Sequence, residues 1–225
     1  MSEAIEIASS RSALAFTCAD LIAAELRAGL AANGKASFCA TGGTTPIECY
    51  RHLAQEDLDW GNVTITLTDE RWVDTKSDWS NERMVRQTLL SGNAMRANFV
   101  PLKARRGGVE DGARLAEKTI RPLAPFDVTL LGMGEDGHFA SLFPGNPALA
   151  EALDPNTERW CVGVPPSEPA PELPRVSLTL RTLLHSKLIL LLITGQKKWD
   201  IASEPGDLPV AQLLARAPVR ILWAA

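Results

Sequence analysis

Short apolar runs alternate with helix-like segments along this chain, and that alternation limits its fold more than any other feature. The clearest runs are FDVTLLGMG at 126–134, KLILLLITG at 187–195 and VRILWA at 219–224. A strand that is apolar on both faces is buried on both, and parallel neighbours need helical crossovers. We therefore expect an α/β protein with a mostly parallel, doubly wound central sheet flanked by helices in three α/β/α layers.

The remaining segments fit the same plan. Leu14, Cys18, Ile22 and Leu26 recur every four residues, which predicts an amphipathic helix that ends near Gly34. Further helices are expected at 45–56, 80–90, 108–120, 196–202 and 207–216, and a brief one after residue 137. Further strands are expected at 36–43, 62–72, 98–102, 160–164 and 175–180. We expect one domain over 1–225, with an exposed loop at 165–174, where five prolines interrupt the pattern.

Composition excludes several classes of protein. Lys and Arg number 23 against 27 Asp and Glu, so a net charge of −4 gives no overall reason to bind nucleic acid. The longest apolar run, at 188–193, is too short to span a bilayer, and MSEAIEIASS is not a secretory signal. We expect a cytoplasmic protein, and a monomer because no long exposed apolar stripe is evident. The cysteines, without C-x-x-C or zinc spacing, predict free buried thiols and no metal; they are Cys18, Cys39, Cys49 and Cys161.

Four polar segments each follow an expected strand: TGGTTP at 41–46, TDERW at 68–72, GMGEDGH at 132–138 and TGQKK at 194–198. Ligands of open α/β sheets bind beyond the carboxyl ends of the strands. These segments are therefore the first candidates for a functional site.

The segment TGGTTPIE has two open interpretations. Thr45, Pro46 and Glu48 form a capping-box pattern with proline at the first helical position. The glycines could also turn backbone N–H groups toward a phosphate or carboxylate. The sequence leaves a structural turn and an anion site about equally open.

Ionisable residues end the strand at 62–72. In an extended chain Asp69 and Arg71 share one face and Glu70 points the other way. Asp69 could orient a base or a cation, and Arg71 could bind an oxyanion; a surface charge cluster is the alternative. Lys197 and Lys198 lie in an expected first helical turn, where lysine is unfavourable unless an anion binds.

The spacing of Gly132, Gly134 and Gly137 matches a dinucleotide fingerprint, but its context does not. That fingerprint opens the first βαβ unit and precedes a long helix, whereas this segment lies in mid-chain before Pro144. The segment is better interpreted as an active-site loop in which His138 serves as a general base. The other two histidines, His52 and His185, lack such surroundings, and we expect them to be structural.

Together these segments resemble the 6-phosphogluconolactonase family, whose fold is shared with glucosamine-6-phosphate deaminase and ribose-5-phosphate isomerase. The matching stretches are TGGTTP, DERWV, SNERM, GMGEDGHFASLFPG, RVSLTL and TGQKKW. Deaminases typically carry Asn-Glu-Pro where this chain has SLFPG. The Lys-Pro-Pro that often precedes the Arg-Ile-Thr-Leu-Thr of the family is absent, although Arg175 matches.

The resemblance implies hydrolysis of 6-phospho-D-glucono-1,5-lactone without metal or cofactor. On this view His138 is the base, and Asp69 holds Arg71 or orients substrate hydroxyls. The oxyanion is bound by backbone near Gly42–Gly43 or by Arg71, and the phosphate by Arg175 and Lys198, or by Arg71 instead. Thr44, Asp136 and Gly137 are also expected at the substrate. The alternatives are a sugar-phosphate isomerase or deaminase, and a non-catalytic sugar-phosphate sensor.

Overall fold

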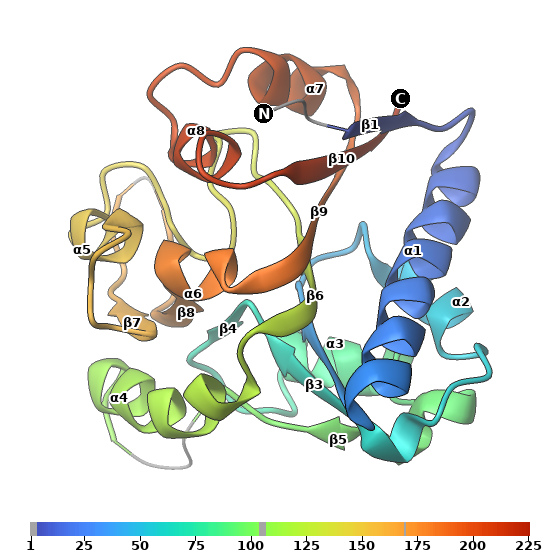
Figure 1. The fold of residues 1–225 in the computed structure, drawn as a ribbon. Coiled ribbons are helices and arrows are strands. Elements are labelled where there is room, and N and C mark those ends of the chain that lie inside the picture. The colour runs from blue at the N-terminus through green and yellow to red at the C-terminus, as the bar shows by residue number, and fades with distance from the viewer. Residues whose placement is uncertain (1–3, 104–106, 169) are drawn as a thin grey trace.

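The structure is a computed structural model that describes residues 4–103, 107–168 and 170–225. Its central sheet has seven parallel strands in the order β1-β10-β9-β6-β2-β3-β5 (Figure 1). Their bounds are β1 Ala4–Ile7, β2 Ala36–Ala40, β3 Val63–Leu67, β5 Asn98–Phe99, β6 Phe126–Leu131, β9 Ser186–Thr194 and β10 Val219–Ala224. The three apolar runs became β6, β9 and β10, and the expected mostly parallel sheet is confirmed.

Helices flank this sheet on both sides. On one face lies α1 (Arg11–Asn33), packed against α2 (Ile47–Leu53), which in turn contacts α3 (Asn81–Thr88). Toward the other face lie α4 (Val109–Ile120), α5 (Leu149–Leu153) and α6 (Leu180–Leu184) (Figure 1). Between β9 and β10 the chain forms α7 (Gln196–Ser203) and α8 (Pro209–Leu214). Short 3-10 helices occupy Trp60–Asn62, Gly92–Arg96 and Arg121–Leu123.

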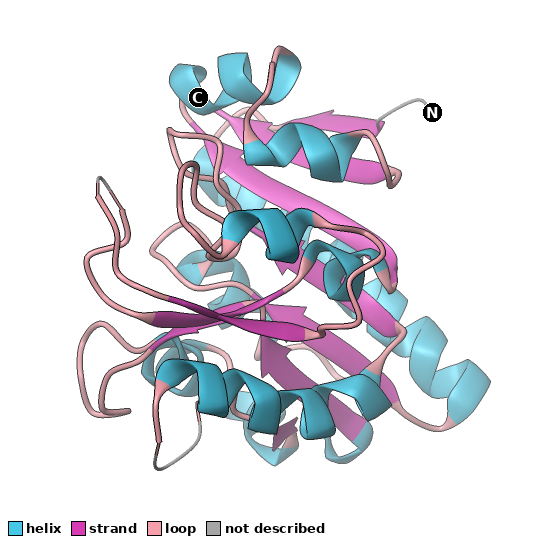
Figure 2. Ribbon diagram, turned by 90° about the vertical axis from the view of Figure 1, so that its left-hand side faces the viewer, coloured by secondary structure: helices cyan, strands magenta, loops and turns pink. Residues whose placement is uncertain are grey.

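A second, antiparallel sheet was not expected. It contains β4 (Asp69–Arg71), β8 (Arg175–Leu178) and β7 (Cys161–Val164), in the order β4-β8-β7, and stands in front of the central sheet in Figure 2. We expected the segments at 160–164 and 175–180 to fill the main sheet. The described residues of the connection between them contain no helix to serve as a crossover, and the two strands pair antiparallel instead.

The expected strand at 62–72 is in fact two strands in two sheets. β3 ends at Leu67, and Thr68 joins the sheets: its N–H donates to the carbonyl of Ala40, and its carbonyl accepts from the N–H of Leu178. β4 then begins at Asp69. This break carries the ionisable residues out of the central sheet and across its carboxyl edge.

Two short segments differ from the expectation, whereas the loop expected at 165–174 is confirmed in its described part. The brief helix after residue 137 is absent, because turns occupy the stretch up to Gly145. The strand β1 was not expected, although it pairs along its whole length with β10. The stretch 165–174 is a loop without helix or strand in its described part, and Pro169 lies outside the described residues.

The core lies on both faces of the central sheet. Every residue of β2 and of β6 is buried, as strands covered on two sides require. On the sheet-facing side of α1, the predicted residues Leu14, Cys18, Ile22 and Leu26 are buried. All four cysteines are free and buried, and burial raises the pKa of the Cys39 and Cys49 thiols, which makes them unreactive.

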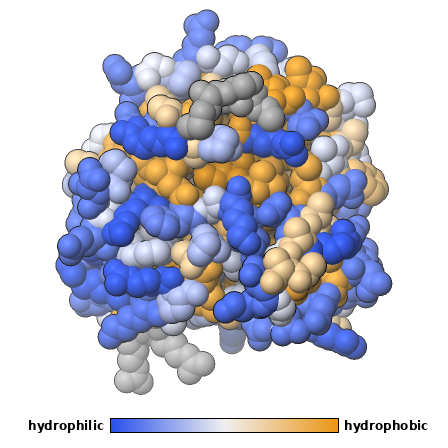
Figure 3. Space-filling model, viewed as in Figure 1, coloured by the Kyte–Doolittle hydropathy of each residue, from blue (hydrophilic) through white to orange (hydrophobic). Residues whose placement is uncertain are grey.

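The surface shown in Figure 3 is mainly hydrophilic, with apolar side chains in a band across its upper half. Large exposed apolar residues include Ile5 and Ile7 of the edge strand β1 and Phe16 of α1. In the described part of the chain, no helix combines the length and the apolar character needed to cross a membrane.

Candidate active site

One cleft collects the four segments that follow the strands. Its volume is about 260 Å³, and it lies at the carboxyl end of the central sheet, where β2, β6 and β9 end. Eight of the ten residues expected at the site line it: Gly42, Gly43, Thr44, Asp69, Arg71, His138, Arg175 and Lys198. Asp136 and Gly137 do not line the cleft, but they lie in the turn that carries His138.

The glycine loop after β2 approaches its neighbours too closely for a side chain. A Cβ at Gly42 would lie 2.0 Å from Oδ1 of Asn81, so only glycine fits. The expected capping box is wrong: α2 begins at Ile47, and no side chain caps its first turn. Glu48 instead accepts a hydrogen bond from Ser12 at 2.6 Å. Thr45 lines the cleft, so the loop is shaped around the cleft and not around a helix cap.

The alternation expected in β4 is confirmed. Asp69 and Arg71 line the cleft, whereas Glu70 points to the first turn of α3. There the Glu70 carboxylate accepts hydrogen bonds from the N–H groups of Asn81 and Glu82 and from the hydroxyl of Ser80. Burial raises the pKa of Glu70 even though these hydrogen bonds oppose the shift. Glu70 therefore attaches β4 to α3 and is not a site residue.

The partners of Asp69 differ from the expectation. Its Oδ1 accepts from the Thr68 hydroxyl at 3.1 Å, and its Oδ2 accepts from the Ser141 hydroxyl at 2.6 Å. The nearest guanidinium is that of Arg175, with Nη1 3.8 Å from Oδ2. Asp69 does not hold Arg71, because β4 pairs with β8 and thereby brings Arg175 to the carboxylate.

Arg71 is held by a residue that we did not place at the site. Its Nη1 donates to Oδ1 of Asn81 at 2.5 Å and to the carbonyl of Trp79 at 3.0 Å. The Asn81 amide also donates to the carbonyl of Asp69 at 2.8 Å. Asn81 lies in SNERM, which was noted only for its resemblance, and that match was the one signal that could have identified it.

Two arginines face each other across the small sheet. Arg71 and Arg175 are directly paired in the register of β4 and β8, a position where like charges repel. The Nε atoms of both are buried and have no hydrogen-bond partner among the described residues. Burial lowers the pKa of Arg175, and the charge of Arg71 lowers it further, while Asp69 opposes the shift. Such a costly arrangement favours an anion as the missing partner.

His138 is oriented by the loop after β6. Its Nδ1 lies 2.6 Å from Oδ1 of Asp136. If Nδ1 carries the proton of that hydrogen bond, Nε2 is free to accept one. Burial alone would raise the pKa of Asp136, but the hydrogen bond and the charge of His138 lower it. A Cβ at Gly134 would lie 2.2 Å from Nδ1 of His138, so this glycine is required by the pair.

The two lysines after β9 have different surroundings. Both lie in the first turn of α7, as expected. Lys198 lines the cleft, whereas Lys197 forms an exposed ion pair with Glu135 at 2.7 Å. Only Lys198 is therefore placed to meet a ligand in this cleft.

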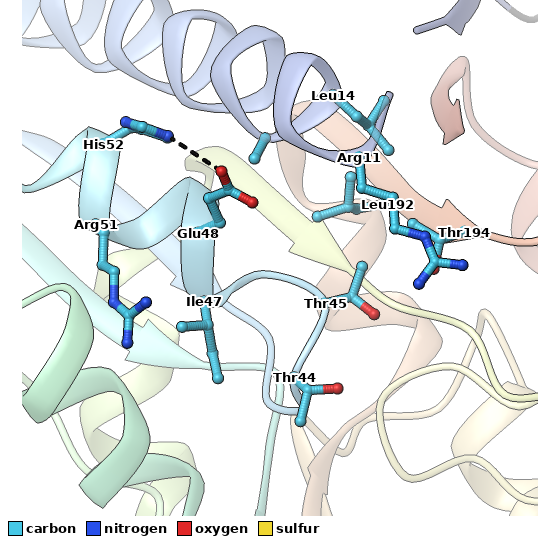
Figure 4. A pocket seen from close by; sticks show the side chains of 11 residues that line it. Arg11, Leu14, Thr44, Thr45, Ile47, Glu48, Arg51, His52, Leu192 and Thr194 are labelled. Carbon is cyan, nitrogen blue, oxygen red and sulfur yellow. Dashed lines mark ion pairs between the residues drawn. The ribbon is translucent and has the colours of Figure 1, made fainter. Parts of the chain in front are cut away.

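A larger cavity, of about 780 Å³, adjoins the cleft and shares Thr44, Thr45 and Leu192 with it. It lies between the start of α1 and α2, and Glu48 projects into it beside His52, 3.8 Å away (Figure 4). The ring of His52 stacks on Phe16 at 3.7 Å. We place the chemistry in the smaller cleft because it holds His138 and the two facing arginines. Neither His52 nor His185, whose Nδ1 lies 2.8 Å from the carbonyl of Arg181, lines that cleft.

A parallel α/β sheet whose carboxyl edge brings together a histidine and several cationic side chains is typical of enzymes that act on small anionic substrates. The family model described as glucosamine-6-phosphate isomerases/6-phosphogluconolactonase matches residues 9–223, and the chain belongs to this family. A 6-phosphogluconolactonase of Caulobacter vibrioides is 47% identical over 224 residues, which are 98% of this chain and 97% of the relative.

Further relatives agree. A 6-phosphogluconolactonase of Rhizobium meliloti is 40% identical over the full length of both chains. A crystal structure of a 6-phosphogluconolactonase from Shewanella baltica superposes with a TM-score of 0.94 at 36% identity, covering 100% of this chain and 98% of the other. The resemblance noted in the sequence is thereby confirmed.

Proposed function

We propose that this protein hydrolyses 6-phospho-D-glucono-1,5-lactone to 6-phospho-D-gluconate, a reaction of the oxidative branch of the pentose phosphate pathway. The observation that carries the proposal is the pair of buried, unpartnered Nε atoms of Arg71 and Arg175 in the same cleft as the His138–Asp136 pair. An anionic sugar ester satisfies both features, because it brings a phosphate to the cations and a carbonyl to the base. The names of the relatives support the same substrate.

In the proposed mechanism His138 acts as general base and then as general acid. Water forms a bond to the lactone carbonyl carbon while its proton passes to Nε2 of His138. The tetrahedral intermediate collapses when the bond to the ring oxygen breaks, and the imidazolium returns the proton to that oxygen. The Asp136 carboxylate holds the imidazole ring and stabilises its charged form. Gly137 contributes the positive φ of the turn that brings the two side chains together.

The basic residues of the cleft are assigned two roles, binding of the phosphate and binding of the carbonyl oxygen. We assign the phosphate to Arg175 and Lys198, which come from β8 and α7 on two sides of the cleft. We assign the carbonyl oxygen to Arg71 and the backbone at Gly42–Gly43, with Thr44 beside them. Asp69, whose carboxylate is fixed by Thr68 and Ser141, is left to accept hydrogen bonds from sugar hydroxyls.

The test generates the lactone in situ from glucose 6-phosphate and follows its loss against spontaneous hydrolysis. We expect clear acceleration by the protein and none by His138→Ala. Arg175→Ala should raise KM about tenfold or more with a smaller change in kcat, because charged hydrogen bonds to the phosphate are lost. Ammonia release from glucosamine 6-phosphate without lactone hydrolysis would instead indicate a deaminase.

The proposal treats residues 1–225 as one catalytic domain that needs neither metal nor cofactor. The monomeric state and the cytoplasmic location expected from the sequence belong to the same proposal. Size-exclusion chromatography with light scattering tests the monomer directly.

A further inference from the structure

One aromatic ring contacts both the proposed base and the proposed phosphate-binding arginine. The ring centroid of Phe143 lies 4.2 Å from that of His138, tilted by 35°. Cζ of Arg175 lies 5.0 Å from the same centroid. The two functional groups come from the loop after β6 and from β8, so Phe143 links segments that are distant in the sequence.

The Arg175 guanidinium depends on this ring for its position. Its side chain is only 17% exposed, and its one charged contact among the described residues is Asp69 at 3.8 Å. It donates no hydrogen bond to any described residue, and its Nε is buried without a partner. Its position is therefore set by packing on the face of Phe143 and by the charge of Asp69, which leaves its donors free for a ligand.

The loop backbone that places Phe143 in this position includes a residue in an unfavourable conformation. Ala140 adopts φ = 48°, which is uncommon for a residue with a Cβ, and its side chain is buried. The Leu142 N–H then donates to the carbonyl of Phe139, which closes a turn between His138 and Phe143. A strained, hydrogen-bonded turn beside a catalytic group indicates that its geometry serves the site.

From these contacts we propose that Phe143 is a positioning residue that sets the separation between the base and the phosphate-binding guanidinium. The distance from the imidazole centroid to Cζ of Arg175 cannot exceed the sum of the two ring contacts, so Phe143 sets an upper limit on the separation that one substrate has to bridge. A neutral ring also positions Arg175 without adding a second carboxylate beside Asp69 to compete with a phosphate for its N–H donors. This inference rests on the roles proposed for His138 and Arg175.

The test compares Phe143→Leu, which keeps an apolar side chain but removes the ring, with Phe143→Tyr, which keeps the ring. For Phe143→Leu we expect KM for the lactone and the inhibition constant of inorganic phosphate to rise together, about fivefold, as loss of a buried cation–π contact predicts. Phe143→Tyr should stay within about twofold of the wild type. The control is Phe126→Leu, also a buried ring, at the first residue of β6, which should change the melting temperature but neither constant.

A double-mutant cycle separates this inference from the function on which it depends. In an Arg175→Ala background, Phe143→Leu should raise KM no further, because the group that the ring positions is gone. If Phe143→Leu is folded and leaves both constants unchanged while Arg175→Ala raises KM, the positioning role is refuted and the phosphate role stands. If Arg175→Ala itself leaves KM unchanged, the phosphate assignment is refuted and the positioning role with it. Should the leucine variant fail to fold, Phe143→Met takes its place in the same comparison.

Discussion

Replacement of Asp136 by Asn tests the proposed base most directly. Asp136 accepts the hydrogen bond that fixes His138, over 2.6 Å, and the amide can donate to Nδ1 instead. The imidazole then carries its proton on Nε2 and cannot take one from water. We expect kcat/KM on the neutral plateau of the pH profile to fall about a hundredfold or more, because general base catalysis contributes a rate enhancement of that size.

The ionised carboxylate of Asp136 is the state that this variant removes. Burial alone would raise the pKa of Asp136, but the hydrogen bond and the charge of His138 lower it. Asp136 is therefore ionised at neutral pH, where the replacement by Asn removes both its charge and its acceptor for the imidazole N–H.

The assay is lactone loss above the spontaneous rate, measured at substrate concentrations below KM on the neutral plateau of kcat/KM. The matched control is Glu135→Gln, which removes the adjacent carboxylate, whose partner is the exposed Lys197, and should leave the profile unchanged. A plateau within threefold of the wild type would contradict the proposed pairing of Asp136 with the base.

Two further predictions concern the segments that line the cleft after β9 and after β2. Lys198→Ala should raise KM about tenfold by removing a charged contact to the phosphate, whereas Lys197→Ala should not; equal effects in steady-state kinetics would contradict the assignment. Gly42→Ala should destabilise the fold by about 1–3 kcal/mol, because its Cβ would lie 2.0 Å from Oδ1 of Asn81, and should lower kcat as Arg71 is displaced. Gly61→Ala, whose Cβ would lie 3.7 Å from its nearest neighbour, is the control for thermal unfolding and kinetics.

The sequence alone determined the layers of the fold and the edge where the site lies. Apolar runs such as 187–195 have to be buried on both faces, and helices between them require parallel crossovers. The carboxyl ends of such strands lie on one edge, so residues as distant as Gly42 and Lys198 were correctly expected to meet there. Period-two alternation likewise placed Asp69 and Arg71 on the same side of their strand.

Only the tertiary structure decided which side chains are partners. Local periodicity gives the face of a strand but not the strand beside it, so the pairing of Arg71 with Arg175 could not be read from either segment. The same pairing brought Arg175 to Asp69 and left Arg71 to Asn81. The contact of Phe143 with His138 and Arg175 depends on a turn at Ala140 that its local sequence does not favour. Short-range sequence patterns therefore predict which residues lie at the carboxyl edge of the sheet. Which of those side chains contact one another is set by long-range packing, and the proposed chemistry of the cleft depends on both.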